Sequence, residues 1–392
     1  MKICIPGSVL GRQESILVQY EDVCIVDQIP KDAWVIGNHP DFLSPSEILD
    51  IFNIENISTS LYTDSEAKSF EILGKDPKEV PWYHVLGSSE IKSRIGKISS
   101  ALNKAFERPD LKSYKDIYVG TKSLLRSLSP ALINIEELKS SLTKEKNPSI
   151  KTTLRSFIPT SKGESLPPLY SQTSTSTGRL TVKSGPSILT LPSKHRKILR
   201  SRYENGSIVC VDFKSLEPRV ALSVIGKEAP EDIYTFIASN ILEQKSERSV
   251  AKIATIAALY GISFRKFQEM SGCKDRYVLE KVKEYFEVKR LSKQLEGNNF
   301  LNYFGRMLDS QTLPHVRVSH FVQSTSCDVV NIAFWNLVKD IKSRSLKIEP
   351  IYVLHDALIL DSSRQDLSEL KDMCSNGLET LLGKFPVEVS KF

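Results

Sequence analysis

Short runs of β-branched and apolar residues, separated by polar turns, mark the first 60 positions of the chain. Runs at 16–20, 23–26 and 34–36 predict the strands of a small sheet. A helix should then begin at Ser44, because this serine can cap a first turn that contains proline and glutamate. Residues 1–85 are therefore interpreted as a small N-terminal α/β region of unassigned role.

The pattern becomes helical from about residue 88 to residue 142. Apolar side chains recur there every three or four positions, as at Ile95, Ile98 and Leu102. The next stretch, 143–187, is rich in Ser, Thr, Pro and Gly, so it is predicted to be connecting loop.

Two later apolar runs each meet a carboxylate. Residues 207–212 predict a buried strand that ends in Asp212, and 351–360 predict a hairpin of two strands interrupted at Asp356. Between them, 246–260 predict a helix in which small and apolar residues follow Arg248. No internal repeat of solenoid period is visible.

Composition places the chain among ordinary globular proteins. Its 392 residues suit two or three domains, with 40% hydrophobic and 26% charged residues. No run approaches the roughly 18 apolar residues of a spanning helix, and the first residues, which lack a long apolar run, predict no secretory signal. Six cysteines without a C-x-x-C pair argue against a disulfide framework or a zinc site. We therefore expect a protein of a reducing, cytoplasmic interior, neither secreted nor membrane-bound.

Positive charge is concentrated in one segment. Residues 151–202 carry ten Lys and Arg and one acidic residue, a net +9, whereas the whole chain carries +6. Lys194, Arg196 and Lys197 belong to its densest part. Such a field fits a nucleic-acid partner, because each neutralised phosphate releases counterions. A solvated basic surface explains the same charges equally well.

Asp212 and Asp356 are the main candidates for chemistry. A carboxylate at the end of a buried strand is costly unless it is paired or binds a cation. If the two strands are neighbours, both carboxylates reach a pair of Mg²⁺ ions, the arrangement used for phosphoryl chemistry on a hydroxyl nucleophile. Taken singly, an aspartate after a strand is more often a turn former or a cap.

A second candidate group lies on the predicted helix at 246–260. Steps of four and eight residues place Arg248, Lys252 and Tyr260 broadly on one side of that helix. Two cations one turn apart can hold a triphosphate, and the aromatic ring can stack on a base. An Arg/Lys pair of this spacing on its own is usually just a solvated face.

In this order the motifs resemble those of family A DNA polymerases, the bacterial DNA polymerase I type, over roughly residues 150–392. Asp212-Phe-Lys-Ser-Leu-Glu-Pro-Arg219 is similar to motif A of the family, and Leu354-His-Asp356 to motif C. Arg248, Lys252, Tyr260 and Gly261 have the spacing of motif B. Further elements of the resemblance are Thr177-Gly-Arg-Leu180, Pro186-Ser-Ile-Leu-Thr-Leu-Pro192, Gln323-Ser-Thr-Ser-Cys-Asp328 and Phe385-Pro-Val-Glu-Val389.

The resemblance implies an α+β, right-hand polymerase fold with an antiparallel palm sheet, helical fingers and a helical thumb, after the small N-terminal α/β region. The expected divisions are 1–85 (N-terminal region), 86–150 (thumb), 151–230 (palm with motif A), 231–304 (fingers with motif B) and 305–392 (palm with motif C).

It also implies roles for individual residues. Asp212 and Asp356 would bind two Mg²⁺ ions, for which Mn²⁺ could substitute, with the Phe213 carbonyl as a further ligand. Lys252 would bind the dNTP phosphates and protonate pyrophosphate. The other implied dNTP-site residues are Arg248, Tyr260, Glu217, Ile256 and Tyr234. The implied DNA-binding residues are Arg179, Gln323 and His355, with Lys194, Arg196 and Lys197 added for their charge.

Glu217 would exclude a ribose 2′-hydroxyl, and Arg179 and Gln323 would contact the minor groove near the primer end, where every correct pair offers acceptors. His355 would support the primer terminus. Arg179 and Gln323 could instead be structural hydrogen bonders, and His355 a turn residue.

Four positions depart from the family pattern. Ile256 stands where the family has Phe or Tyr, and Ala357 replaces the carboxylate after Asp356. Tyr234 replaces a phosphate-contacting His, and Ser215 stands at the motif A Gln. These changes leave the metal-binding pair intact but alter the surroundings of the nucleotide.

The N-terminal third lacks a convincing proofreading site. Asp64-Ser-Glu66 fits the tripeptide of an exonuclease, but it follows a polar stretch and has no clear partner carboxylates. About 85 residues are also short for such a domain. We therefore expect a polymerase without its own 3′-5′ exonuclease.

The leading hypothesis is a DNA-templated DNA polymerase that uses primer-template DNA and dNTPs. A single-subunit RNA polymerase and a noncatalytic primer-template binding protein are the alternatives; Glu217 disfavours the first and the two aspartates disfavour the second. Helicase, processivity factor and separate exonuclease are conceivable accessory partners. A phage- or plasmid-type replication system in the cytoplasm, an organelle or nucleoid, or a role in DNA repair would fit this build.

Overall fold

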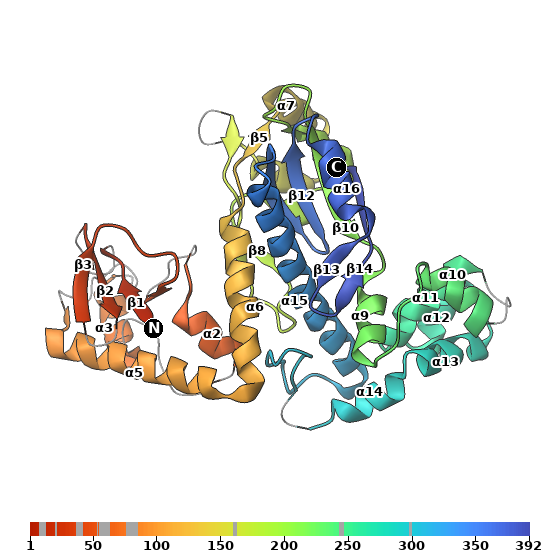
Figure 1. Cartoon of the computed structure of the whole chain (residues 1–392), viewed down its shortest axis with the longest axis horizontal. Helices are drawn as coiled ribbons and strands as arrows, with labels where there is room; N and C mark the ends of the chain where they lie inside the picture. The colour runs from red at the N-terminus through yellow and green to blue at the C-terminus, as the bar shows by residue number, and fades with distance from the viewer. Residues whose placement is uncertain are drawn as a thin grey trace. The chain divides into compact units, whose positions relative to one another are not determined.

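The computed structural model describes residues 1–7, 13–19, 22–36, 42–52, 54, 63–75, 85–159, 163–242, 247–297 and 300–392. The chain divides into two compact units (Figure 1). One unit comprises Met1–Lys122 and Phe304–Arg306, and the other comprises Ser123–Tyr303 and Met307–Phe392. Within the described part, no helix is both long and apolar enough to cross a membrane.

A four-stranded sheet forms the start of the first unit. Its strands are β1 (Lys2–Ile5), β2 (Ser15–Gln19), β3 (Asp22–Val26) and β4 (Trp34–Val35). They lie in the order β3-β2-β1-β4, with β1 antiparallel to β2 and parallel to β4. The predicted sheet is therefore present, and its core contains Cys4, Leu17, Ala33 and Val35.

Helices make up the rest of the first unit. They are α2 (Pro45–Ile51), α3 (Asp64–Ile72), α5 (Ser88–Glu107) and α6 (Pro109–Arg126). Ser44 caps α2 as the sequence predicts, and the buried face of α5 includes Ile95, Ile98 and Leu102. The division between the units falls after Lys122, inside α6. The five-part division expected from the sequence stays a prediction.

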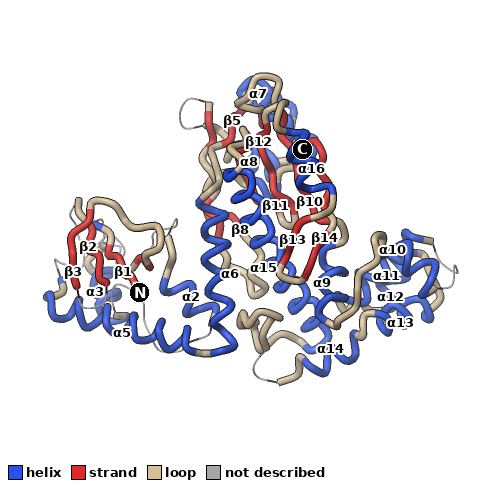
Figure 2. Tube along the Cα trace, in the orientation of Figure 1, coloured by secondary structure: helices blue, strands red, loops and turns tan. Residues whose placement is uncertain are grey.

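The second unit is built around a four-stranded antiparallel sheet in the order β11-β12-β10-β15. Its strands are β10 (Ser207–Phe213), β11 (Ile348–Leu354), β12 (Ala357–Ser362) and β15 (Val387–Lys391). The long helix α15 (Pro314–Ser343) packs against this sheet (Figure 2), and the rings of Phe213 and Phe334 lie 5.5 Å apart. Strand β10 and the β11–β12 hairpin were both predicted, and the antiparallel sheet and α+β class are confirmed.

Short strands and helices precede this sheet. They are β5 (Ala131–Ile133), α7 (Ile135–Lys144), α8 (Pro148–Arg155), β6 (Glu164–Ser165), β7 (Leu169–Ser171), β8 (Thr181–Ser184), η2 (Ile188–Thr190), η3 (Ser193–Ile198) and β9 (Leu199–Arg200). The prediction that 143–187 is only connecting loop is wrong. Asn147 caps α8 and Pro148 occupies its first turn, a start signal that the Ser- and Thr-rich composition concealed.

A group of helices follows β10. It consists of α9 (Leu216–Val224), α10 (Ile233–Phe236), η4 (Ile237–Ile241), α11 (Arg248–Leu259), α12 (Phe264–Ser271), α13 (Arg276–Tyr285) and α14 (Val288–Gln294). Helix α11 packs against α10, α12 and α13, and its small residues Ala251, Ala254 and Ala258 are buried. The chain ends with α16 (Leu367–Ser375) and the hairpin of β13 (Leu378–Thr380) and β14 (Gly383–Phe385) before β15.

Candidate functional site

Two aspartates meet at one end of the antiparallel sheet. Asp212 is the penultimate residue of β10, and Asp356 lies in the two-residue turn between β11 and β12. Strands β10 and β12 pair so that Asp212 lies opposite Ala357, and the Phe213 amide donates to the Asp356 carbonyl at 3.2 Å. The fold therefore brings together two carboxylates that are far apart along the chain.

The charge balance around Asp212 favours a bound cation. Its pKa is raised to about 6, first because burial removes solvent from the carboxyl group and then because of the charges on Asp356 and Glu388. Mg²⁺ prefers oxygen ligands and commonly takes one or two carboxylates together with substrate phosphates. In the described residues no three His, Cys, Asp or Glu side chains gather closely enough to hold a metal by themselves. The pair thus fits ions that substrate helps to bind.

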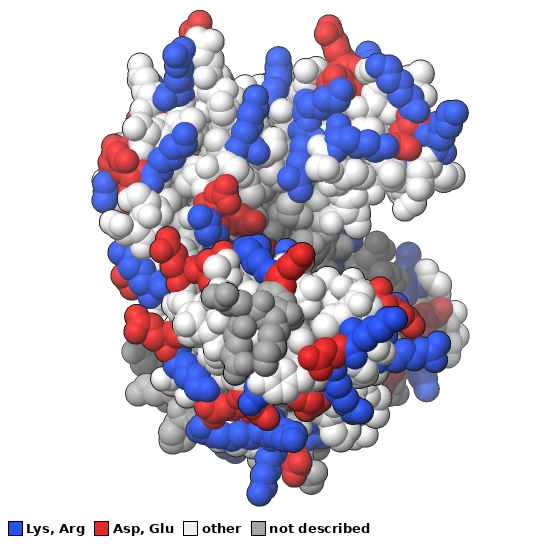
Figure 3. Space-filling model, turned by 90° about the vertical axis from the view of Figure 1, so that its right-hand side faces the viewer, with Lys and Arg blue, Asp and Glu red and all other residues white. Residues whose placement is uncertain are grey.

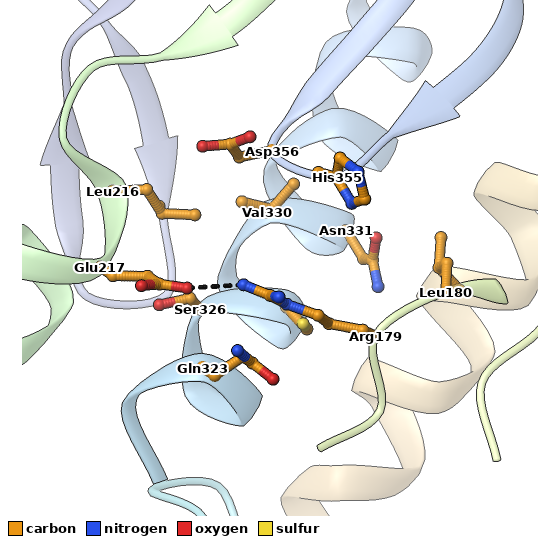
Figure 4. Close-up of a pocket in the computed structure, with 11 residues that line it drawn as sticks. Arg179, Leu180, Leu216, Glu217, Gln323, Ser326, Val330, Asn331, His355 and Asp356 are labelled. Atoms are coloured by element: carbon orange, nitrogen blue, oxygen red, sulfur yellow. Dashed lines mark hydrogen bonds and ion pairs between the residues drawn. The ribbon is translucent and has the colours of Figure 1, made fainter. Parts of the chain in front are cut away.

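A hydrogen-bonded network surrounds Glu217 on α9. Arg179 donates to its carboxylate at 2.8 Å (Figure 4). The Tyr260 hydroxyl donates to the same carboxylate at 2.5 Å. The Gln323 amide accepts from both terminal nitrogens of Arg179, at 3.0 and 3.1 Å, and donates to Thr177 at 2.8 Å. Burial and the neighbouring Glu217 raise the pKa of Tyr260 to about 12. Tyr260 therefore stays a hydrogen-bond donor near neutral pH.

Arg179 and Glu217 also line a small cavity of about 80 Å³ next to the two-residue turn. Gln323, His355 and Asp356 are among the other residues that line it. In Figure 4, Arg179 extends from its loop toward Glu217, with His355 and Asp356 on one side of it and Gln323 on the other. Residues from four separate segments are thus gathered beside Asp356.

A larger cavity of about 330 Å³ shares Glu217 and Asp356 with the first and is also lined by residues of α10 and α11. Its lining includes Ser215, Glu217, Tyr234, Ile256, Tyr260 and Asp356. Arg248 begins α11 and Lys252 follows one turn later, both exposed. Asp232 accepts from the Arg248 Nε at 2.9 Å, and this bond lowers the pKa of Asp232 to about 2. Arg248 therefore carries its charge beside a permanently ionised partner.

Comparison with solved structures gives the POL domain of Pol1 from M. smegmatis, in complex with DNA primer-template and dNTP. It matches with a TM-score of 0.66 over 99% of this chain and 94% of that one, at 12% sequence identity. The chain has the fold of a family A DNA polymerase. The fold expected from the motifs is thereby confirmed.

Sequence comparison agrees with the polymerase fold. The DNA polymerase I of Borreliella burgdorferi is 23% identical over 258 residues, covering 54% of this chain and 27% of that protein. The DNA polymerase I of Lactococcus lactis is 22% identical over 251 residues, covering 54% and 28%. The match thus spans little more than a quarter of these relatives' length. No protein-family model matches the chain.

In the basic segment, Lys194 and Lys197 are paired with acidic residues, whereas the charge of Arg196 partly offsets the rise in the pKa of Asp212. Glu145 pairs with Lys194 at 2.7 Å, and Glu137 pairs with Lys197 at 2.8 Å. The Arg196 guanidinium lies 4.2 Å from the centre of the Phe392 ring. Acidic residues of α7 and at its C-terminal end therefore weaken the positive electrostatic field that the sequence predicts for this segment. A DNA-binding role for these three cations stays a prediction.

Charge of both signs is spread over the molecular surface elsewhere. On the face drawn in Figure 3, Lys and Arg predominate toward the top, at the level of α16 in Figure 1, while acidic side chains are interspersed lower down.

Sequence reasoning missed Glu388 and Asp232. Glu388 lies opposite Asp212 on β15, on the other flank from Ala357, so a carboxylate neighbours Asp212 from an unexpected strand. One hint of Glu388 lay in the sequence, because it belongs to the element 385–389 that resembles the family, but the pairing of that strand with β10 could not be predicted. The only hint of Asp232 was that it lies two residues before Tyr234.

Asp64 and Glu66 belong to a helix start rather than a strand. Glu66 accepts from the Thr63 amide at 2.7 Å, completing a capping box for α3. It also pairs with Arg94 at 2.9 Å. These contacts give the Asp64-Ser-Glu66 tripeptide a structural explanation, as the first turn of a capped helix.

Proposed function

We propose that this chain is a DNA-templated DNA polymerase that adds dNTPs to a primer 3′-hydroxyl. The observation that carries the proposal is the meeting of Asp212 and Asp356 beside a cavity that also receives Glu217 and Tyr260. Support comes from the DNA polymerase I relatives and from the fold shared with a domain solved with primer-template and dNTP. Primer-template DNA and dNTPs would then be its ligands.

Asp212 and Asp356 would hold two divalent cations, with the Phe213 carbonyl as a further ligand. Two bound Mg²⁺ ions, or Mn²⁺ in their place, would supply activation of the 3′-hydroxyl and stabilisation of the leaving pyrophosphate. The primer 3′-oxygen would form a bond to the α-phosphorus while the bond from the α-phosphorus to the oxygen that bridges to the β-phosphate breaks. The hydroxyl proton would pass to solvent water, and Lys252 would give a proton to the departing pyrophosphate.

Side chains around the two cavities would position the substrates. Arg248 and Lys252 bind the triphosphate, and Tyr260 with Ile256 packs beside the nucleotide. Arg179 and Gln323 contact minor-groove acceptors at the primer end, which every correct base pair offers. His355 supports the primer terminus.

Glu217 would select the sugar. Its carboxylate is held by Arg179 and Tyr260, so it cannot easily move aside for a 2′-hydroxyl. A ribonucleotide would therefore meet a fixed, bulky acceptor. This contact distinguishes the proposal from an RNA polymerase of related architecture.

Primer extension with dNTPs and with NTPs tests the proposal. We expect extension with dNTPs and its loss in Asp356→Ala, while primer-template binding persists. Extension that survives Asp356→Ala would refute the mechanism. Binding without any extension would instead favour the noncatalytic alternative, and a preference for NTPs would favour the RNA polymerase.

Glu217→Ala tests the sugar selection separately. The variant should admit NTPs more readily, lowering the dNTP preference by roughly 10- to 100-fold. Unchanged selectivity in Glu217→Ala would remove Glu217 from this role.

A mismatched primer end should remain unexcised by the wild-type chain, in line with the proposal that its described residues hold no proofreading site.

A further inference from the structure

An aromatic ring lies beneath the two cations at the start of α11. The Arg248 guanidinium carbon is 5.3 Å and the Lys252 Nζ is 5.9 Å from the centre of the Tyr234 ring. Both distances fall within the range of about 6 Å in which a cation is attracted to the face of an aromatic ring. Tyr234 is only 8% exposed, so its ring is a fixed surface rather than a mobile one.

The elements on both sides keep this ring in place. Asp232 caps α10 by accepting from the amides of Tyr234, at 3.0 Å, and Thr235, at 3.1 Å. The same carboxylate holds the Arg248 Nε at 2.9 Å, and α10 packs against α11. One aspartate thus fixes the start of the helix that carries the ring and the guanidinium that lies on it.

Tyr234 also borders the cavity beside Asp356. Its hydroxyl lies near the Ser215 side chain. Ser215 has a left-handed backbone with φ of 52° and lies in the turn between β10 and α9. Tyr234, Ser215 and Asp356 line the same cavity of about 330 Å³. The side chain that contacts the cations of α11 therefore also lines the cavity that Asp356 borders.

Tyr234 and Ser215 are also two of the four positions that depart from the family pattern. A large hydroxylated ring stands at one position and a short hydroxyl at the other, and both line the cavity of about 330 Å³.

Arg248 and Lys252 carry like charges one helical turn apart, and such pairs repel each other. The negative face of a shared ring offsets this repulsion and holds both side chains on the same side. We propose that Tyr234 is a positioning residue, a platform whose ring keeps Arg248 and Lys252 directed at a triphosphate. The inference rests on the proposed function for the identity of the ligand.

Inorganic tripolyphosphate and dNTP together test the platform. Tyr234→Leu removes the ring face, so it should weaken tripolyphosphate binding, measured by calorimetry, about tenfold. It should raise the KM for dNTP by a similar factor and change kcat less than about threefold. Tyr234→Phe keeps the ring, so it should restore both values to within about threefold of wild type. Tyr277→Leu is the matched control. It removes a different ring that contacts a cation, since the Lys281 Nζ lies 5.3 Å from the centre of the Tyr277 ring on α13.

The outcomes are separable. Equal tripolyphosphate affinity in wild type and Tyr234→Leu overturns the platform, and so does a Tyr234→Phe variant as weak as Tyr234→Leu. Should the leucine variant fail to fold, Tyr234→Met carries the same test with a side chain that adapts to irregular space. If the wild type binds tripolyphosphate through Tyr234 but never extends a primer, the proposed function fails while the platform stands.

Discussion

His355 holds a conformation that ordinary side chains avoid. Its φ is 56°, in the turn that also carries Asp356, and left-handed residues other than glycine cost about 1–2 kcal/mol. We therefore expect His355→Gly to raise the free energy of unfolding by about 1 kcal/mol. Primer extension should fall, because the side chain proposed to support the primer terminus is gone. Urea unfolding and an extension assay measure the two effects.

Ser345 supplies the matched control for this substitution. Its φ is 55°, and it follows α15 in a turn outside both cavities. Ser345→Gly should stabilise the protein by a similar amount without loss of extension. If His355→Gly stabilises nothing while Ser345→Gly does, the backbone of the turn at His355 is not strained.

The raised pKa of Asp212 predicts a particular pH dependence. A carboxyl group whose pKa is about 6 when folded and 3.8 when unfolded disfavours the folded state whenever it is ionised. The resulting decrease in the free energy of unfolding is complete above about pH 6 and disappears below about pH 4. Metal-free Asp212→Asn should therefore melt at a higher temperature than wild type near pH 8, and at the same temperature near pH 4. A difference in melting temperature that does not change with pH would rule out the ionisation of Asp212 as its cause.

The end of α11 depends on a residue without a side chain. Gly261 has φ of 65°, and a Cβ there would collide with the backbone carbonyl of His315, at the start of α15. Neither backbone can yield easily, because α11 and α15 are both packed helices. Gly261→Ala should therefore destabilise the protein by more than about 2 kcal/mol and raise the KM for dNTP as α11 is displaced. Chemical denaturation and steady-state kinetics would detect both changes.

Substitution of Gly272 separates the effect of a Cβ collision on stability from the effect of a left-handed backbone. It ends α12 with φ of 70°, and a Cβ there meets nothing within 4 Å. Gly272→Ala should cost only the left-handed conformation, about 1 kcal/mol. Equal losses in the two variants would mean that contact with His315 is unimportant.

At the scale of the molecule, the sequence could predict the elements and motifs that depend on the local pattern of residues. The strand before Asp212, the hairpin around Asp356 and the spacing of Arg248 and Lys252 all follow from periodicity and motif order. What it could not predict depends on pairing between distant segments. Glu388 faces Asp212 only because of the β10–β15 register, and the charges of Lys194 and Lys197 are balanced only because α7 packs against η3.

The separation of core and site also predicts how the whole protein responds to metal removal. The sheet is held by buried apolar residues such as Val211, Leu358 and Ile359, whereas the two aspartates lie at its end. Chelation by EDTA should therefore leave the circular dichroism spectrum unchanged. Primer extension should fall by more than about a thousandfold, the loss of about 4 kcal/mol of transition-state stabilisation. Added Mg²⁺ or Mn²⁺ should restore the wild type but not Asp356→Asn, and unfolding on chelation would instead assign the metal a structural role.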